Sequence, residues 1–173
     1  NGTIPWSVDE RGEIENDFLI TGSSSILKSI DCGLAISKIL QKNKNVENWT
    51  ESYHLLSEAI KNPSGKFDLV KNRKRFSMDS YYPILSGCLN ENEIKSYIDK
   101  IFSNFYVDKI GIKCVIEEPW VTVAETSEFI ISLMISGDID KSKELLIDVL
   151  SICDENKIPF MGWQYEENIF WPN

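Results

Sequence analysis

The sequence predicts an all-α fold made of antiparallel helical hairpins. Six segments repeat apolar residues at the spacing of an α-helix. In the first, third and fifth of these segments the apolar residues surround nearly the whole helix, whereas the other three carry one apolar stripe and many charges. Because a helix that is apolar on all sides is buried on several sides, each hairpin should pair an inner helix with an outer helix.

The first hairpin is expected between residues 22 and 61. Its inner helix should cover about residues 22–41, where a run of serines supplies cap candidates. Its outer helix should cover about residues 46–61, where Asn48 and Glu51 have the spacing of a capping box.

The second hairpin should begin near Asp79, because Pro83 is tolerated in the first turn of a helix and not in its middle. Its outer helix should cover about residues 91–105. Asn90 and Glu93 have the spacing of a capping box at its start.

A short extended segment is expected near residues 110–116, which are rich in β-branched residues. The third hairpin follows it. The inner helix should open at a capping box of Thr122 and Glu125 and end at Gly137, and the outer helix should cover about residues 138–155. Glu125 is therefore expected to serve as a capping partner rather than as a catalyst.

Hairpins with apolar inner surfaces need neighbours, so the chain should form either an open solenoid or, as we favour, part of a closed α/α toroid. Three hairpins make an arc, and residues 162–173 look like the approach to a fourth inner helix. We expect residues 1–173 to form a single domain that is a fragment of a larger toroid, with its open edge covered by self-association.

The composition argues against several classes of protein. The length of 173 residues suits one domain. Eighteen basic residues against 27 acidic ones give a net charge of -9, which argues against nucleic acid as a partner. No apolar run approaches the ~20 residues of a membrane span. The four cysteines form no Cys-x-x-Cys pair, so we expect reduced thiols and no metal. We also expect no cofactor and a cytoplasmic location.

The loops that lead into the inner helices would open on one face of a toroid, and each combines a carboxylate with aromatic residues. Aromatic faces cover the apolar C–H surface of a sugar, and carboxylates accept hydrogen bonds from its hydroxyl groups. This combination favours a carbohydrate or another small-molecule ligand. The residues predicted to bind it are Asp17, Tyr82, Trp120, Trp163 and Glu166.

Glycoside hydrolysis needs two carboxyl groups, ~5 Å apart for retention of configuration or ~6.5–9.5 Å apart for inversion. Asp79 and Glu118 are the predicted catalytic pair. Tyr81 is not expected to share a cavity with Tyr82, because adjacent helical residues diverge by ~100°.

Four segments of the chain resemble a known group of proteins. They are Phe18–Ile26, Arg75–Gly87, Glu118–Glu128 and Gly162–Glu166. They look like bacterial α/α-toroid proteins labelled prenyltransferase-like, whose fold is shared with six-hairpin glycosidases and terpenoid cyclases. The resemblance spreads over most of the chain and corresponds to part of a toroid, and the prenyltransferase-like label implies isoprenoid chemistry.

Three hypotheses for function stay open. The first is a carbohydrate-active protein with glycoside hydrolase-like acid and base chemistry, and the second is a non-catalytic helical-repeat module that binds a peptide or a protein. An isoprenoid-binding toroid comes third. The Asp-x-Asp-Asp motif of terpenoid cyclases does not occur, and the single His54 has no matching cluster for the zinc of protein prenyltransferases.

Overall fold

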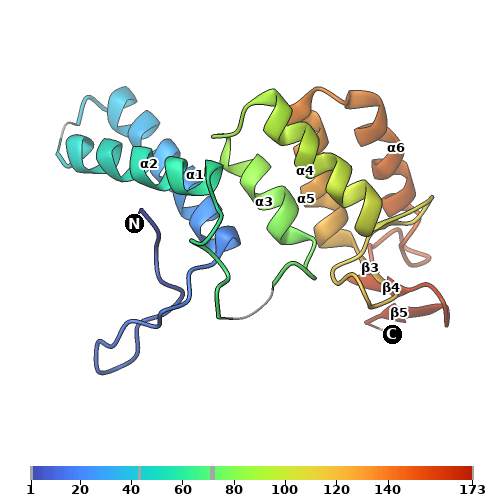
Figure 1. The fold of residues 1–173 in the computed structure, drawn as a ribbon. Coiled ribbons are helices and arrows are strands. Elements are labelled where there is room, and N and C mark those ends of the chain that lie inside the picture. Colours follow the sequence, from blue (N-terminus) through green and yellow to red (C-terminus); the bar gives the residue numbers. More distant parts are fainter. Residues whose placement is uncertain (1, 43, 71–72, 173) are drawn as a thin grey trace. The chain divides into compact units, whose positions relative to one another are not determined.

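The protein, as described by a computed structural model, is mostly helical (Figure 1). The structure describes residues 2–42, 44–70 and 73–172, and these ranges contain six helices and five short strands. None of these helices is long and apolar enough to cross a membrane.

The chain divides into two compact units. One consists of Asn1–Arg73 with Leu85–Leu89, and the other of Lys74–Ile84 with Asn90–Asn173. The single domain expected from the length stays a prediction.

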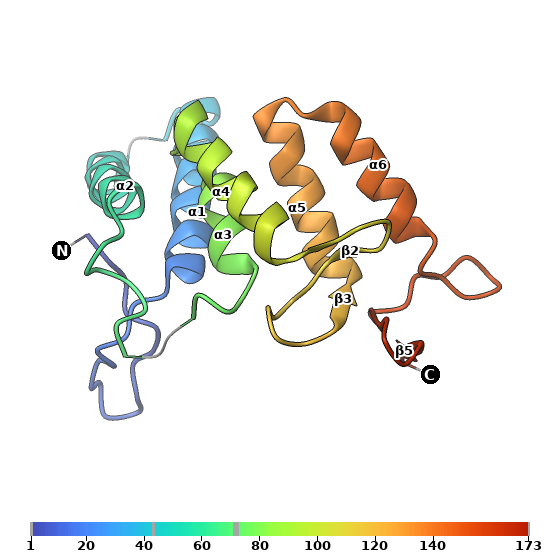
Figure 2. The ribbon, with the colours of Figure 1, turned by 45° about the vertical axis from the view of Figure 1, so that its right-hand side comes forward.

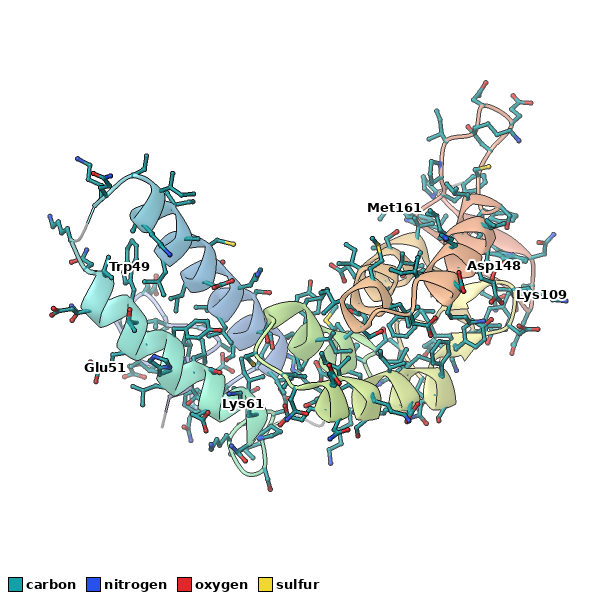
Figure 3. All side chains as sticks on the ribbon, turned by 90° about the horizontal axis from the view of Figure 1, so that it is seen from above. Trp49, Glu51, Lys61, Lys109, Asp148 and Met161 are labelled. Carbon is teal, nitrogen blue, oxygen red and sulfur yellow. The ribbon has the colours of Figure 1, made fainter. Side chains whose placement is uncertain are left out.

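The first unit is built on the hairpin of α1 (Ile20–Ile39) and α2 (Val46–Lys61). Trp49 packs on α1 (Figure 3), where a Cβ added at Gly33 would lie 3.5 Å from the indole ring. The predicted capping box at Asn48 is wrong, because α2 begins earlier and its N-cap is Asn45. Helix α1 and α2 share a core with the loop that follows them; its buried members are Ile20, Leu27, Leu56, Ala59, Ile60 and Phe67.

Helix α3 (Met78–Ser86) starts within one residue of the predicted position, and Pro83 lies inside it. Helix α4 (Glu91–Asn104) begins at the predicted capping box. There the Asn90 side chain accepts from the backbone N–H of Glu93 at 3.0 Å, and the Glu93 carboxylate accepts from the backbone N–H of Asn90 at 2.8 Å. Local sequence alone fixes this helix start.

The second unit also contains two small antiparallel sheets, so the all-α prediction holds only for the helical majority. Strands β1 (Tyr106–Val107) and β2 (Gly111–Ile112) form the first sheet. The second has the order β3-β4-β5 and joins β3 (Trp120–Thr122), β4 (Gly162–Gln164) and β5 (Ile169–Trp171).

The segment predicted as the approach to a fourth inner helix is therefore a β-hairpin. Its sequence explains the outcome. The two strands contain Trp163 in β4 and Phe170 and Trp171 in β5, and aromatic residues favour strands. Asn168 takes a φ of 56°, a left-handed conformation that asparagine tolerates and that turns the chain between the two strands.

Helices α5 (Val123–Ser136) and α6 (Ile139–Leu150) pack as a hairpin (Figure 2). Gly137 ends α5 with a φ of 86°, and Asp138 caps α6 by accepting from the backbone N–H of Lys141 at 3.1 Å. Thr122 caps α5 from the last position of β3, so the second sheet and α5 are continuous at this point.

The expected burial of the inner helices on nearly every side is wrong for α1 and α5. Ile36 and Ile39 of α1 are 55% and 77% exposed, and Ile131 and Met134 of α5 are 50% and 55% exposed. Each helix buries one side against its hairpin partner and presents apolar residues on another. Apolar residues on all sides of a helix therefore indicate a surface that needs to be covered. In α1 and α5 part of this apolar surface is exposed.

A glycine at the start of β2 is held in place by helix α5. Gly111 has a φ of 145°, and a Cβ there would lie 2.6 Å from Thr126 Oγ1 and 2.9 Å from Val121 Cγ1. Gly111→Ala should lower the free energy of unfolding by about 2–4 kcal/mol, through steric overlap and backbone strain together.

The matched control is Gly137→Ala, because Gly137 also has a positive φ but has nothing within 4 Å of an added Cβ. Backbone strain alone should cost it about 1 kcal/mol. Urea unfolding of both variants measures the difference. Equal losses would show that close packing on Thr126 does not constrain Gly111.

Candidate functional site

A partly buried polar junction joins α3 to α5 in the second unit. The Tyr81 hydroxyl donates to Glu128 Oε2 at 2.7 Å, and the Tyr82 hydroxyl donates to Glu128 Oε1 at 3.1 Å. The two adjacent tyrosines thus converge on one carboxylate, and the expectation that they do not share a cavity stays a prediction. Their Cα–Cβ bonds diverge, but the side chains are long enough for both hydroxyl groups to reach one carboxylate, with ring centroids 5.4 Å apart.

Both tyrosines are neutral donors at ordinary pH. Burial, followed by the hydrogen bond to Glu128, raises the pKa of Tyr81 far above its usual value. Burial also raises the pKa of Tyr82, with the charge of Glu128 as the next cause. A deprotonated tyrosine would place a second negative charge against the same carboxylate, so the junction is stable only with both hydroxyl protons in place.

A second carboxylate, Glu125, lies one helical turn before Glu128 on α5. Residues three apart share a face of a helix. The Glu125 backbone N–H donates to Thr122 Oγ1 at 3.3 Å, which is half of the predicted capping box. The carboxylate itself accepts a hydrogen bond from the Cys114 thiol, and burial together with the charge of Glu125 raises the pKa of Cys114 to about 12.

Glu125 also lines a pocket of about 490 Å³ beside the three-stranded sheet. The register of the sheet explains the walls of this pocket. Thr122 pairs with Gly162 and Gly162 with Trp171, so these three share one face of the sheet, and Trp120 lies on that face two residues earlier. The residues that line the pocket are Trp120, Thr122, Ala124, Glu125, Met161, Gly162 and Trp171.

Gly162 keeps the floor of the pocket open. The residue is buried, and a Cβ added to it would lie 3.1 Å from the backbone oxygen of Val121 and 3.6 Å from Cε3 of Trp120. A larger side chain would occupy the space beside the two indole rings. The pocket therefore depends on a glycine at this point of β4.

Trp163, one of the predicted sugar platforms, is on the other face of the sheet. It pairs with Val121 and Phe170, and its ring stacks on Phe170 with centroids 5.4 Å apart and an angle of 13°. Its indole N–H donates to Asn168 Oδ1 at 3.2 Å. Trp120 and Trp163 therefore do not line one pocket. Trp171, rather than the predicted Trp163, lies beside Trp120 in its lining.

The other predicted site residues of the second unit occupy different surroundings. Asp79 is 9% exposed in the first turn of α3, and its charge opposes the lowering of the Lys100 pKa that burial causes. Glu118 is exposed in the turn before β3, and Glu166 is exposed in the turn between β4 and β5. The predicted pair of Asp79 and Glu118 thus combines a buried carboxyl group with an exposed one.

Asp17 belongs to the first unit and is 2% exposed. Within the described ranges no group of three or more His, Cys, Asp and Glu side chains is arranged to hold a metal ion. Glu125, Glu128 and Trp171 were not predicted as site residues from the sequence. The one signal available was the three-residue spacing of the two glutamates, which places both on the same face of α5.

No protein-family model matches the chain. The chain is similar to the MMP endo-(1,4)-3-O-methyl-alpha-D-mannosidase of Mycolicibacterium hassiacum, with 31% identity over 171 residues, or 99% of the chain. The chain spans 46% of the length of that protein, about half. The name of that protein is the name of a mannosidase.

The Cys114 thiol should react slowly with iodoacetamide at pH 8, because its raised pKa keeps it protonated. Cys32, which is exposed, should react first. Glu125→Gln removes the charge and should speed alkylation of Cys114, since each unit of fall in pKa raises the thiolate fraction about tenfold.

Mass spectrometry of peptides from timed quenches measures both rates. Glu155→Gln, an exposed position in a turn, serves as the control. An unchanged Cys114 rate in Glu125→Gln would show that burial alone protects the thiol.

Proposed function

We propose that the chain is a carbohydrate-active, glycosidase-like protein that holds a sugar ring in the pocket beside β3, β4 and β5. One observation carries the proposal. Two indole rings, Trp120 and Trp171, lie on the same face of the sheet beside a pocket that contains the Glu125 carboxylate. Indole rings can cover the C–H faces of a sugar, and a carboxylate can accept from its hydroxyl groups.

The substrate class that we propose is an α-D-mannoside with O-methyl groups. The similar protein is named for endo-acting cleavage of a 1,4-linked 3-O-methyl-alpha-D-mannoside. A methyl ether adds apolar surface and removes a hydroxyl donor. Such a group matches a pocket where Thr122 and Glu125 are the polar side chains of the lining and the rest are apolar.

For hydrolysis we propose Glu125 as the carboxyl group that meets the glycosidic bond. It lines the pocket, whereas both oxygens of Glu128 already accept tyrosine hydroxyl groups. Glu118 is the proposed second carboxyl group, because the exposed turn that holds it leads directly into Trp120. One of the two must be protonated and the other ionised for acid and base chemistry.

In this proposal Glu125, rather than the predicted Asp79, is the catalytic partner of Glu118. Asp79 remains the alternative partner, and Tyr82 acts in the proposal by holding Glu128 rather than by touching the sugar. Trp163 and Glu166 stay predictions for substrate binding beyond the pocket.

A non-catalytic binding module is the second candidate. The observation that favours it is the stack of Phe160, Phe170 and Trp163, in which aromatic residues of the loop are covered by one another rather than left for a ligand. Such a module would bind without cleaving. Hydrolysis by the chain separates the two candidates.

We also propose that the helical hairpins belong to an α/α toroid. The exposed apolar residues on α1 and α5 support this, since further hairpins in a longer chain would cover them. Self-association through the same surfaces is the other way to cover them.

The activity test uses 3-O-methyl-α-D-mannan oligosaccharides as substrate. Glu125→Gln should lower kcat by about 10²–10⁴-fold with little change in binding, because an amide cannot transfer the proton. Trp171→Ala should weaken binding by about tenfold through the lost ring face. Glu155→Gln, exposed in a turn, is the matched control.

Oligosaccharide release measured by mass spectrometry and binding measured by calorimetry give the two readouts. Wild-type rates in Glu125→Gln would remove the acid–base assignment. Wild-type affinity in Trp171→Ala would remove the pocket as the sugar site. Binding with no cleavage by the unaltered chain would favour the non-catalytic module.

A further inference from the structure

A groove of about 460 Å³ lies in the second unit between α4 and the turn that joins α5 to α6. Three apolar side chains that line it, Ile94, Ile98 and Phe102, follow one another at intervals of four along α4, so they form one row on the helix. These three are half-buried. Ile135, near the end of α5, lines the groove too and is 47% exposed. The groove therefore has an apolar lining that is partly open to solvent.

The charged side chains that line this groove are mainly acidic. Glu91, Lys95 and Asp99 form a second row along α4, again at intervals of four, and Asp138 lies at the start of α6. All four are exposed. Three carboxylates and one ammonium group give the lining a formal charge of -2. The groove, called the α4 groove below, therefore favours a partner that is apolar and positively charged.

The end of α1 in the first unit has the opposite charge. Ile36, Ile39 and Leu40 are 55%, 77% and 60% exposed there, and intervals of three and four place them on one face of the helix end. Between Asp31 and Glu47 the sequence contains three lysines and no acidic residue. This stretch thus has a formal charge of +3 in a chain whose net charge is -9.

The three lysines are Lys38, Lys42 and Lys44, and all of them are exposed. Together with the three exposed aliphatic residues they define the α1 tip. Within residues 2–42, 44–70 and 73–172 no ion pair involves these lysines or the carboxylates of the α4 groove. Both surfaces therefore present charges and apolar side chains for a contact between molecules.

A second copy of the chain has the chemistry that the α4 groove favours. Two grooves repel one another through their carboxylates, and two tips repel one another through their lysines, so the complementary contact pairs a tip with a groove. We propose that the α1 tip of one copy docks into the α4 groove of another, with its aliphatic residues against the apolar row and its lysines beside the carboxylates. Neither surface contains a residue of the pocket beside β3, β4 and β5.

A contact between unlike surfaces leaves one tip and one groove unused at the ends of a pair. Such a heterologous contact produces rings or open chains of copies rather than a closed two-fold dimer. The contact of one helix end with one groove is small, so we expect a dissociation constant of about 10–100 μM. Salt should weaken the contact, because it screens exposed charges.

Sedimentation velocity of the chain at concentrations of about 5–500 μM, a range that brackets the expected dissociation constant, tests the proposal. The mean sedimentation coefficient should rise with concentration, and added salt should reduce the rise. A tip variant, Ile39→Ser with Leu40→Ser, and a groove variant, Asp99→Lys, should each weaken association about tenfold or more. Lys42→Glu, a second tip variant, should act in the same direction.

A mixture of the two variants distinguishes this contact from other modes of association. The groove variant keeps its tip and the tip variant keeps its groove, so an equimolar mixture should form 1:1 pairs that do not grow further. Ile147→Ser and Glu155→Lys are the matched controls, because both change exposed residues outside the tip and the groove. The second control alters the net charge as Asp99→Lys does. Both should associate like the unaltered chain.

A chain that stays monomeric at every concentration would overturn the proposal and leave the α4 groove to another positively charged partner. Unchanged association in both the tip variant and the groove variant would overturn it as well. So would a mixture of the two variants that forms no pairs.

Discussion

The second unit depends on the pairing of the α5 carboxylates with donors from outside the helix. Glu128 accepts from Tyr81 and Tyr82, and Glu125 accepts from Cys114. Half-buried carboxylates one turn apart would repel one another and lose hydration without such donors. The tyrosines fix α3 on one side of α5, and the loop of Cys114 fixes the approach to β3. The position of the sheet follows from this, because β3 runs directly into α5 at Thr122.

The pocket follows from the alternation of side chains between the two faces of the sheet. In β3, β4 and β5 alternate side chains face opposite ways, so Trp120 and Trp171 share a face while Trp163 points from the other. A register shifted by one residue would exchange Trp171 for Phe170 and close the floor that Gly162 keeps open. Aromatic side chains are common in this segment. Only those on the sheet face that carries Trp120 and Trp171 can contribute to a site that also contains Glu125.

The sequence was sufficient wherever the controlling interactions are local. The six helices, the capping box of Asn90 and the one-sided α4 follow from spacing within a turn or two. Helix α6 ends at Leu150, before its predicted end, and Leu146 and Leu150 of its predicted apolar stripe are exposed. Tyr81 and Tyr82 meet Glu128 across 47 and 46 residues of sequence, and β4 and β5 form by pairing between strands. The spacing of apolar residues does not encode either kind of contact. Glu125 was assigned to a cap because its backbone role is local, whereas the role of its carboxylate depends on Cys114.

We propose that the indole rings of Trp120 and Trp171 form the sugar-binding surface of the second unit. The most direct measurement is the NMR signal of each indole N–H, assigned by single Trp→Phe variants, during titration with methyl 3-O-methyl-α-D-mannopyranoside. We expect the signals of Trp120 and Trp171 to shift together along one binding curve, while that of Trp163, which is hydrogen-bonded to Asn168, stays in place. A shift of Trp163 with Trp120 and Trp171 unmoved would contradict it.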